Sequence, residues 1–139
     1  LEGQAYDVVT IAAVANDPEL MSLAFELGNA PDLTTSLYDG TALIAAAHLG
    51  HVEVVRRLID AGASLDHINN LAWTALIEAV VLGDGGADHQ AVVRLLVDAG
   101  ADRSIGDRDG VTPLAHAKWR APIRWSGLIV SASSASGPL

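Results

Sequence analysis

The sequence predicts an all-α fold, a solenoid of about four helix-turn-helix repeats with an irregular C-terminal end. Residues 41–47 and 74–80 match one another 33 positions apart, and residues 112–117 repeat the pattern 38 positions further on. An amphipathic stretch that runs into a glycine follows each of the first two segments. The chain is 50% hydrophobic but only 4% aromatic, so small and aliphatic residues must fill its core. These features favour closely packed helical repeats over a β-sandwich.

The first helix of each unit has recognisable ends. Thr41, Thr74 and Thr112 open the repeated segments, and a threonine there can accept a hydrogen bond from a free backbone N–H of the first turn. Gly50 and Gly83 follow at the distance where the helix should end, and we expect left-handed backbone at both. The alanine-rich stretches between these ends predict thin helices that can approach their neighbours closely.

The second helix of each unit is an amphipathic stretch. Val54, Val55 and Leu58 are spaced so that they form one buried stripe of a helix, which Gly62 ends. Residues 92–100 repeat this arrangement. A fainter copy of the whole unit lies between residues 9 and 28.

The order of these segments resembles the ankyrin repeat, whose consensus contains T-P-L-H-x-A-A, G-H, V-V and L-L-x-x-G-A. The second unit matches best, from Asp39 through Gly50 and His51 to Gly62 and Ala63. The T-A-L-I form of the first helix is typical of bacterial members of the family. The resemblance implies one ankyrin-repeat domain over residues 1–139, with repeats at about 4–36, 37–69, 70–107 and 108–130 and a tail at 131–139.

The chain departs from the consensus inside its repeats. The histidine of T-P-L-H, which hydrogen-bonds neighbouring repeats in the family, is replaced by Ile44, Ile77 and Ala115. We therefore expect apolar packing at this position. The third unit has five extra residues within 83–89, which we expect to form a mobile loop with Asp88 capping the next helix. This loop is either a tolerated surface loop or a contact or ion-binding loop.

The C-terminal end lacks the expected second helix. Pro122 bars an uninterrupted helix, and residues 131–139 have the composition of a linker. The end is a divergent cap, a shifted reading frame or appended sequence, and the residues leave these alternatives open. Its apolar side chains would cover the third repeat or form a dimer contact: Trp119, Trp125, Leu128, Ile129 and Val130.

Charge and composition exclude several kinds of partner and site. The formal net charge of −9 makes anionic nucleic acid and membrane surfaces poor partners, and the absence of cysteine excludes disulfides and cysteine-ligated metals. Lys and Arg are absent up to Gly50, and Asp and Glu are absent from Gly110 onward. No apolar run approaches the ~20 residues of a membrane span. We expect a soluble protein, cytoplasmic or periplasmic, although a removed leader or shortened start would also leave Leu1 first.

The resemblance implies that a partner protein contacts the loops between repeats, called fingers here, and the concave face of the first helices. Trp73 is the first candidate, because tryptophan is over-represented in binding hot spots. Its other interpretation is packing against the neighbouring repeat, and the same alternative holds for Tyr38. The full set of candidate partner-binding residues is Tyr38, His48, His67, Ile68, Asn70, Leu71, Trp73, Glu78, Arg108, His116 and Trp119.

Catalytic and metal sites are weakly indicated. His48, Glu78 and His116 belong to adjacent repeats whose helices should be spaced roughly 10 Å apart, too wide for shared ligation. A second acidic cluster, formed by Asp84, Asp88 and His89, has no recognised ligand spacing. We therefore expect no enzyme activity, no cofactor and no metal.

The function predicted from the sequence is binding of a partner protein of unknown identity through the fingers and the concave face. One alternative is a structural protein that self-associates weakly, through its apolar C-terminal segment or its oppositely charged ends. A further alternative is a metal-binding or enzymatic site on the repeat scaffold.

Overall fold

The computed structural model describes residues 7–34 and 39–120. Within these ranges the chain forms seven α-helices and no strand, which confirms the all-α repeat fold. None of these helices is long and apolar enough to cross a membrane. The predicted irregular end beyond residue 120 and the candidate Tyr38 lie outside the described residues. The helices are α1 (Val8–Ala15), α2 (Pro18–Glu26), α3 (Ala42–Leu49), α4 (Val52–Asp60), α5 (Ala75–Leu82), α6 (Ala87–Ala99) and α7 (Pro113–Arg120).

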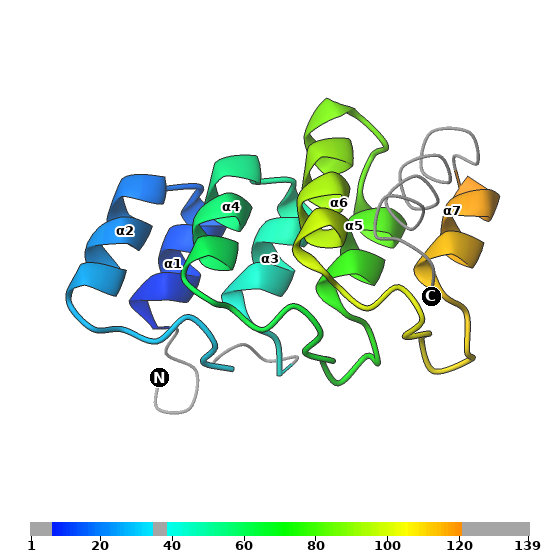
Figure 1. Ribbon diagram of the computed structural model, residues 1–139, viewed down its shortest axis with the longest axis horizontal. Coiled ribbons are helices and arrows are strands. Elements are labelled where there is room, and N and C mark those ends of the chain that lie inside the picture. The colour runs from blue at the N-terminus through cyan, green and yellow to red at the C-terminus, as the bar shows by residue number, and fades with distance from the viewer. Residues whose placement is uncertain (1–6, 35–38, 121–139) are drawn as a thin grey trace.

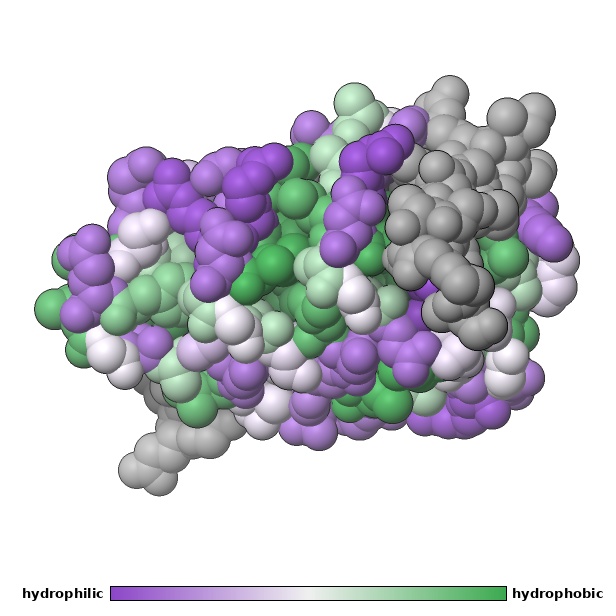
Figure 2. Space-filling model, in the orientation of Figure 1, coloured by the Kyte–Doolittle hydropathy of each residue, from purple (hydrophilic) through white to green (hydrophobic). Residues whose placement is uncertain are grey.

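The helices stack in two layers (Figure 1). The first helices of the repeats, α1, α3, α5 and α7, contact one another in sequence, and the second helices α2, α4 and α6 form the other layer. Loops that connect one repeat to the next run along a single edge of the stack. Hydrophilic side chains form ridges over the second layer, with hydrophobic residues in the furrows between them (Figure 2).

Side-chain caps begin the first helices, as the sequence predicts. The hydroxyl oxygens of Thr41, Thr74 and Thr112 accept hydrogen bonds from the backbone N–H three residues later, at 3.4, 3.2 and 3.3 Å. Asp7 takes the same role at the start of α1, where its carboxylate accepts from the backbone N–H of Thr10 at 2.7 Å. The caps fix the same rotational register for all four first helices, so equivalent residues face the same side.

Small residues form the contact between the first helices. Ala12, Ala13, Ala46, Ala47 and Ala79 are fully buried in the core. Their side chains end at Cβ, so the backbones of neighbouring repeats approach closely. The second layer supplies larger side chains to the same core, among them Met21, Val54, Val55, Leu58, Val92, Val93 and Leu96.

Two histidines of the second helices connect neighbouring repeats. The Nδ1 atom of His51 lies 2.8 Å from the carbonyl oxygen of Ala13, and Nε2 of His89 lies 2.9 Å from the carbonyl oxygen of His48. These contacts join each repeat to the preceding one. At the position of the consensus histidine Ile44 and Ile77 are buried, so apolar packing there is confirmed.

The prediction of left-handed backbone is confirmed at Gly50 and wrong at Gly83. Gly50 has φ 75°, whereas Gly83 has φ −74° and ψ 161°, an extended conformation open to any residue. Glycine is needed at position 83 for space, because a Cβ there would overlap the carbonyl oxygen of Ala79 and the His89 ring. The chain therefore continues from the end of α5 without the left-handed residue that ends α3.

The loop that contains the extra residues of the third repeat is shorter than expected. The loop is confined to residues 83–86, because α6 begins at Ala87. Asp88 lies inside the first turn of α6 and does not cap it; Gly86 holds the cap position. Asp84 instead closes the loop, with its carboxylate accepting from the backbone N–H of Gly86 at 2.8 Å and lying 3.1 Å from Nδ1 of His89.

The cap of α5 gives a test of the repeat geometry. Replacing Thr74→Ala leaves the backbone N–H of Ile77 without its buried acceptor, and we expect the free energy of unfolding to fall by about 1 kcal/mol. Chemical denaturation followed by circular dichroism measures this change. Thr34→Ala, at an exposed loop threonine, is the matched control and should change stability by less than about 0.5 kcal/mol. Equal effects of the two substitutions would contradict the capping role.

Candidate functional site

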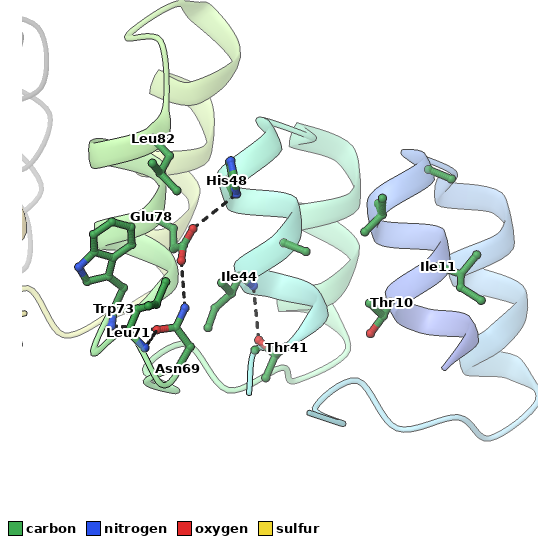
Figure 3. A pocket seen from close by; sticks show the side chains of 14 residues that line it. Thr10, Ile11, Thr41, Ile44, His48, Asn69, Leu71, Trp73, Glu78 and Leu82 are labelled. Atoms are coloured by element: carbon green, nitrogen blue, oxygen red, sulfur yellow. Dashed lines mark hydrogen bonds and ion pairs between the residues drawn. The ribbon is translucent and has the colours of Figure 1, made fainter. Parts of the chain in front are cut away.

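A groove of about 780 Å³ crosses the first helices of three repeats. Its lining comes from α1, α3, α5 and the finger that precedes α5 (Figure 3). The size lies within the roughly 300–1,000 Å³ of pockets that hold ligands in proteins. The lining residues are Thr10, Ile11, Val14, Ala15, Gly40, Thr41, Ile44, Ala45, His48, Asn69, Leu71, Trp73, Glu78 and Leu82.

Exposed apolar side chains form the walls of the groove. Ile11 and Val14 of α1 are 49% and 54% exposed, and Leu71 and Leu82 at the other end are also exposed. The half-buried Trp73 completes this end. Apolar side chains gathered in a concave surface, instead of scattered singly, are typical of binding sites.

A buried acid lies between these walls. Glu78 is only 4% exposed, and its Oε2 atom accepts a hydrogen bond from Nδ2 of Asn69 at 3.0 Å. Its Oε1 atom lies 3.6 Å from Nδ1 of the exposed His48 (Figure 3). Burial raises the pKa of Glu78, while the Asn69 hydrogen bond and the nearby His48 oppose that rise.

Asn69 couples this acid to the finger. Its Oδ1 atom accepts from the backbone N–H groups of Leu71 and Trp73 at 2.9 and 3.1 Å, while its Nδ2 atom donates to Glu78. One buried amide therefore shapes the turn that carries Leu71 and Trp73 and also holds the carboxylate. The positions of the apolar wall and of the acid are linked through it.

The fourth repeat has the same arrangement with donor and acceptor exchanged. Asp107 occupies the place of Asn69, and its Oδ2 atom lies 2.8 Å from Nε2 of His116, which occupies the place of Glu78. The pKa of Asp107 is lowered, against the effect of burial. The hydrogen bond from the backbone N–H of Val111 is the largest cause, and the hydrogen bonds from His116 and from the backbone N–H of Asp109 contribute less. The acid thus lies in the finger in the fourth repeat and on the first helix in the third.

Four of the predicted site residues lie together in the groove: His48, Leu71, Trp73 and Glu78. As a candidate on the concave face, Glu78 was expected to face outward, but it is buried. Nδ1 of His48 lies 3.6 Å from Oε1 of Glu78, because both side chains extend into the space between α3 and α5.

The remaining candidates in the fingers lie outside the groove. Nε2 of His67 lies 2.7 Å from the carbonyl oxygen of Asp39, and the Arg108 guanidinium donates to the carbonyl oxygen of Asn70 at 3.0 Å. These contacts hold each finger to the preceding one. Ile68 is exposed nearby and does not line the groove.

His116 and Trp119 of α7 also lie outside the groove. Their rings make an edge-to-face contact with centroids 6.2 Å apart, and Trp119 is otherwise largely exposed. His116 is held by Asp107, as described above. Among the residues that the structure describes, no three His, Asp or Glu side chains come close enough to hold a metal ion.

Sequence reasoning missed the α1 wall of the groove, although a signal was present. Ile11 and Val14 lie four and seven positions after the capping Asp7, as Ala45 and His48 do after Thr41. The first repeat is the faintest copy, and its cap is an aspartate instead of a threonine. Alignment on the cap would have identified both residues.

Comparisons with known proteins agree with the helical repeat fold. A model of ankyrin repeats in three copies matches residues 9–107. The chain is 34% identical over 118 residues to the ankyrin repeat protein YahD of Escherichia coli (strain K12), covering 84% of this chain and 59% of that protein. It thus spans less than two thirds of that relative's length.

Two solved structures are also similar. One is an ankyrin repeat domain from Acinetobacter baumannii AYE, with a TM-score of 0.83 and 39% identity over 93% of this chain and 70% of that chain. The other is the ankyrin repeat protein EF0377, with a TM-score of 0.84 and 32% identity over 91% of this chain and 64% of that chain.

The buried acid predicts a specific dependence of stability on pH. Because the folded state raises the pKa of Glu78, the folded protein binds this proton more tightly than the unfolded chain does. The contribution of Glu78 to stability therefore falls as pH rises from the ordinary value of a glutamate through the raised value. Glu78→Gln keeps an acceptor for Asn69 but carries no charge, so we expect it to raise the free energy of unfolding at pH 7 by on the order of 1 kcal/mol.

Urea unfolding between pH 4 and pH 8 measures this difference, which should widen with pH. Glu26→Gln, at an exposed glutamate at the end of α2, is the matched control and should change stability by less than about 0.5 kcal/mol. A Glu78→Gln variant that is less stable than the native chain at pH 7 would contradict the cost assigned to the buried acid.

Proposed function

This chain belongs to the ankyrin-repeat family, and from that premise we propose that it is a binding module that takes a segment of a partner protein into the groove over α1, α3 and α5. Ankyrin repeats are generally protein–protein interaction modules. The observation that carries the proposal is the groove itself, where exposed apolar side chains of the first and third repeats line a concave surface that also contains the buried Glu78. Partner identity is no part of the proposal.

Rigidity of the site supports binding. The groove is formed by helices whose backbones are fixed by caps, by alanine packing and by the hydrogen bonds of His51 and His89. A site already held in its binding geometry loses little conformational entropy when a partner is bound. The finger that carries Trp73 is held by Asn69, so the aromatic side chain is positioned in advance.

The predicted candidates divide into three roles in this proposal. His48, Leu71, Trp73 and Glu78 contact the partner directly. His67, Asn70 and Arg108 hold the fingers in place, while Ile68, His116 and Trp119 give further contact area only to a partner that extends beyond the groove. Tyr38 stays a prediction, as does self-association through the C-terminal segment.

A matched pair of double variants tests the groove. Ile11→Gln with Val14→Gln removes the apolar wall on α1. Leu23→Gln with Leu27→Gln removes two exposed apolar side chains, one on α2 and one at its C-terminal end, away from the groove. The bait is the full chain, and captured proteins from a lysate of cells that contain it are identified and their affinities measured. We expect the α1 variant to weaken binding at least about tenfold and the α2 variant to bind normally.

Circular dichroism must show that both variants are folded. A partner that binds the α1 variant as tightly as the native chain would contradict the groove as the binding site. Failure of the native chain to retain any partner would contradict the proposal that the described repeats suffice for binding.

A further inference from the structure

We propose that the partner segment that binds in this groove carries a lysine or arginine whose cationic group pairs with Glu78, between apolar side chains that contact the groove walls. The inference rests on the proposed function and specifies the chemistry of the occupant. It predicts a sequence preference that can be measured before any natural partner is known.

Among the described residues, one oxygen of Glu78 lacks a hydrogen bond of ordinary length. Oε2 accepts from Asn69 at 3.0 Å, within ordinary hydrogen-bond range. Oε1 lies 3.6 Å from Nδ1 of His48, which is longer than a good hydrogen bond. A primary ammonium or guanidinium group that reached Oε1 would form a short, charge-assisted hydrogen bond there.

Within the part of the chain that the structure describes, no Lys or Arg lines this groove. None occurs in the sequence before Arg56 or between Arg57 and Arg94. The helices α1, α3 and α5 and the finger before α5 therefore contain no permanent positive charge. Among the described residues of the lining, His48 is the one titratable side chain besides Glu78. Charge complementarity thus favours a cationic occupant.

Binding of an uncharged apolar segment would be penalised. Such a segment would cover Glu78 and remove the remaining water from its carboxylate without replacing the lost hydrogen bonds. A segment with a Lys or Arg avoids that penalty, so Glu78 discriminates between partners more than it adds affinity. This discrimination gives a physical reason for an acid in an otherwise apolar groove.

The walls also suit the rest of a long basic side chain. The methylene groups of Lys or Arg can lie against apolar surface while the charged end reaches an acid. Trp73 and Leu71 lie at the same end of the groove as Glu78 (Figure 3). Because Ile11 and Val14 line the opposite end, on α1, an occupant that fills the groove must span three repeats. A protein segment meets this requirement better than a small amine does.

The test uses a displayed library of random 12-residue peptides selected on the full chain. We expect enriched peptides to share one Lys or Arg flanked by apolar residues. Synthetic versions are then measured by isothermal titration against the native protein and Glu78→Gln, each with the cationic residue and with methionine in its place. Both single changes should weaken binding at least about tenfold, and the methionine change should have little further effect on Glu78→Gln.

The peptide substitution leaves the protein unaltered, so loss of folding cannot imitate the result. Enriched peptides that lack a cation, or that bind Glu78→Gln as tightly as the native chain, would overturn the inference. If such peptides still lose affinity for the Ile11→Gln, Val14→Gln variant, the groove remains the binding site and the proposed function stands. Peptides indifferent to that variant as well would count against both proposals.

Discussion

Close contact between the alanine-rich first helices is the constraint on which the rest of the structure depends. Ala12 and Ala13 of α1, Ala46 and Ala47 of α3 and Ala79 of α5 are fully buried, because they are small enough for neighbouring backbones to approach. Larger side chains on the second helices fill the other layer of the same core. The close approach also lets side chains of different repeats interact, so His48 and Glu78 meet although 30 residues separate them in the sequence.

The finger and the first helix act as one unit in the third and fourth repeats. Asn69 with Glu78, and Asp107 with His116, join the base of a finger to the helix that follows it. The hydrogen bond is kept while the chemical groups are exchanged. In the fourth repeat the acid is in the finger and its pKa is lowered, whereas in the third repeat the acid is on the helix and its pKa is raised by burial. The repeat scaffold thus tolerates different charges at one structural position.

Glu78 shows how a binding surface can conflict with stability. A buried carboxylate loses hydration, which one hydrogen bond from Asn69 and the imidazole of His48 at 3.6 Å replace only in part. Proteins commonly retain such groups where function requires them, at the expense of the folded state. Leu71 and Trp73, which lie at the same end of the groove, increase that conflict, because apolar surface near a charge weakens its solvation.

The sequence alone determined the repeat, its two helices and their caps, because these features depend on local chemistry. Thr41, Thr74 and Thr112 cap where their spacing predicts, and the buried alanine and valine positions follow from helical periodicity. Only the tertiary structure decided which side chains meet. Three features depend on distances between repeats, which cannot be derived from the spacing of residues within one repeat. They are the burial of Glu78, its contact with His48, and the contacts by which His67 and Arg108 hold the fingers. The need for glycine at position 83 likewise follows from the His89 ring and the Ala79 carbonyl oxygen, which lie close to it in space.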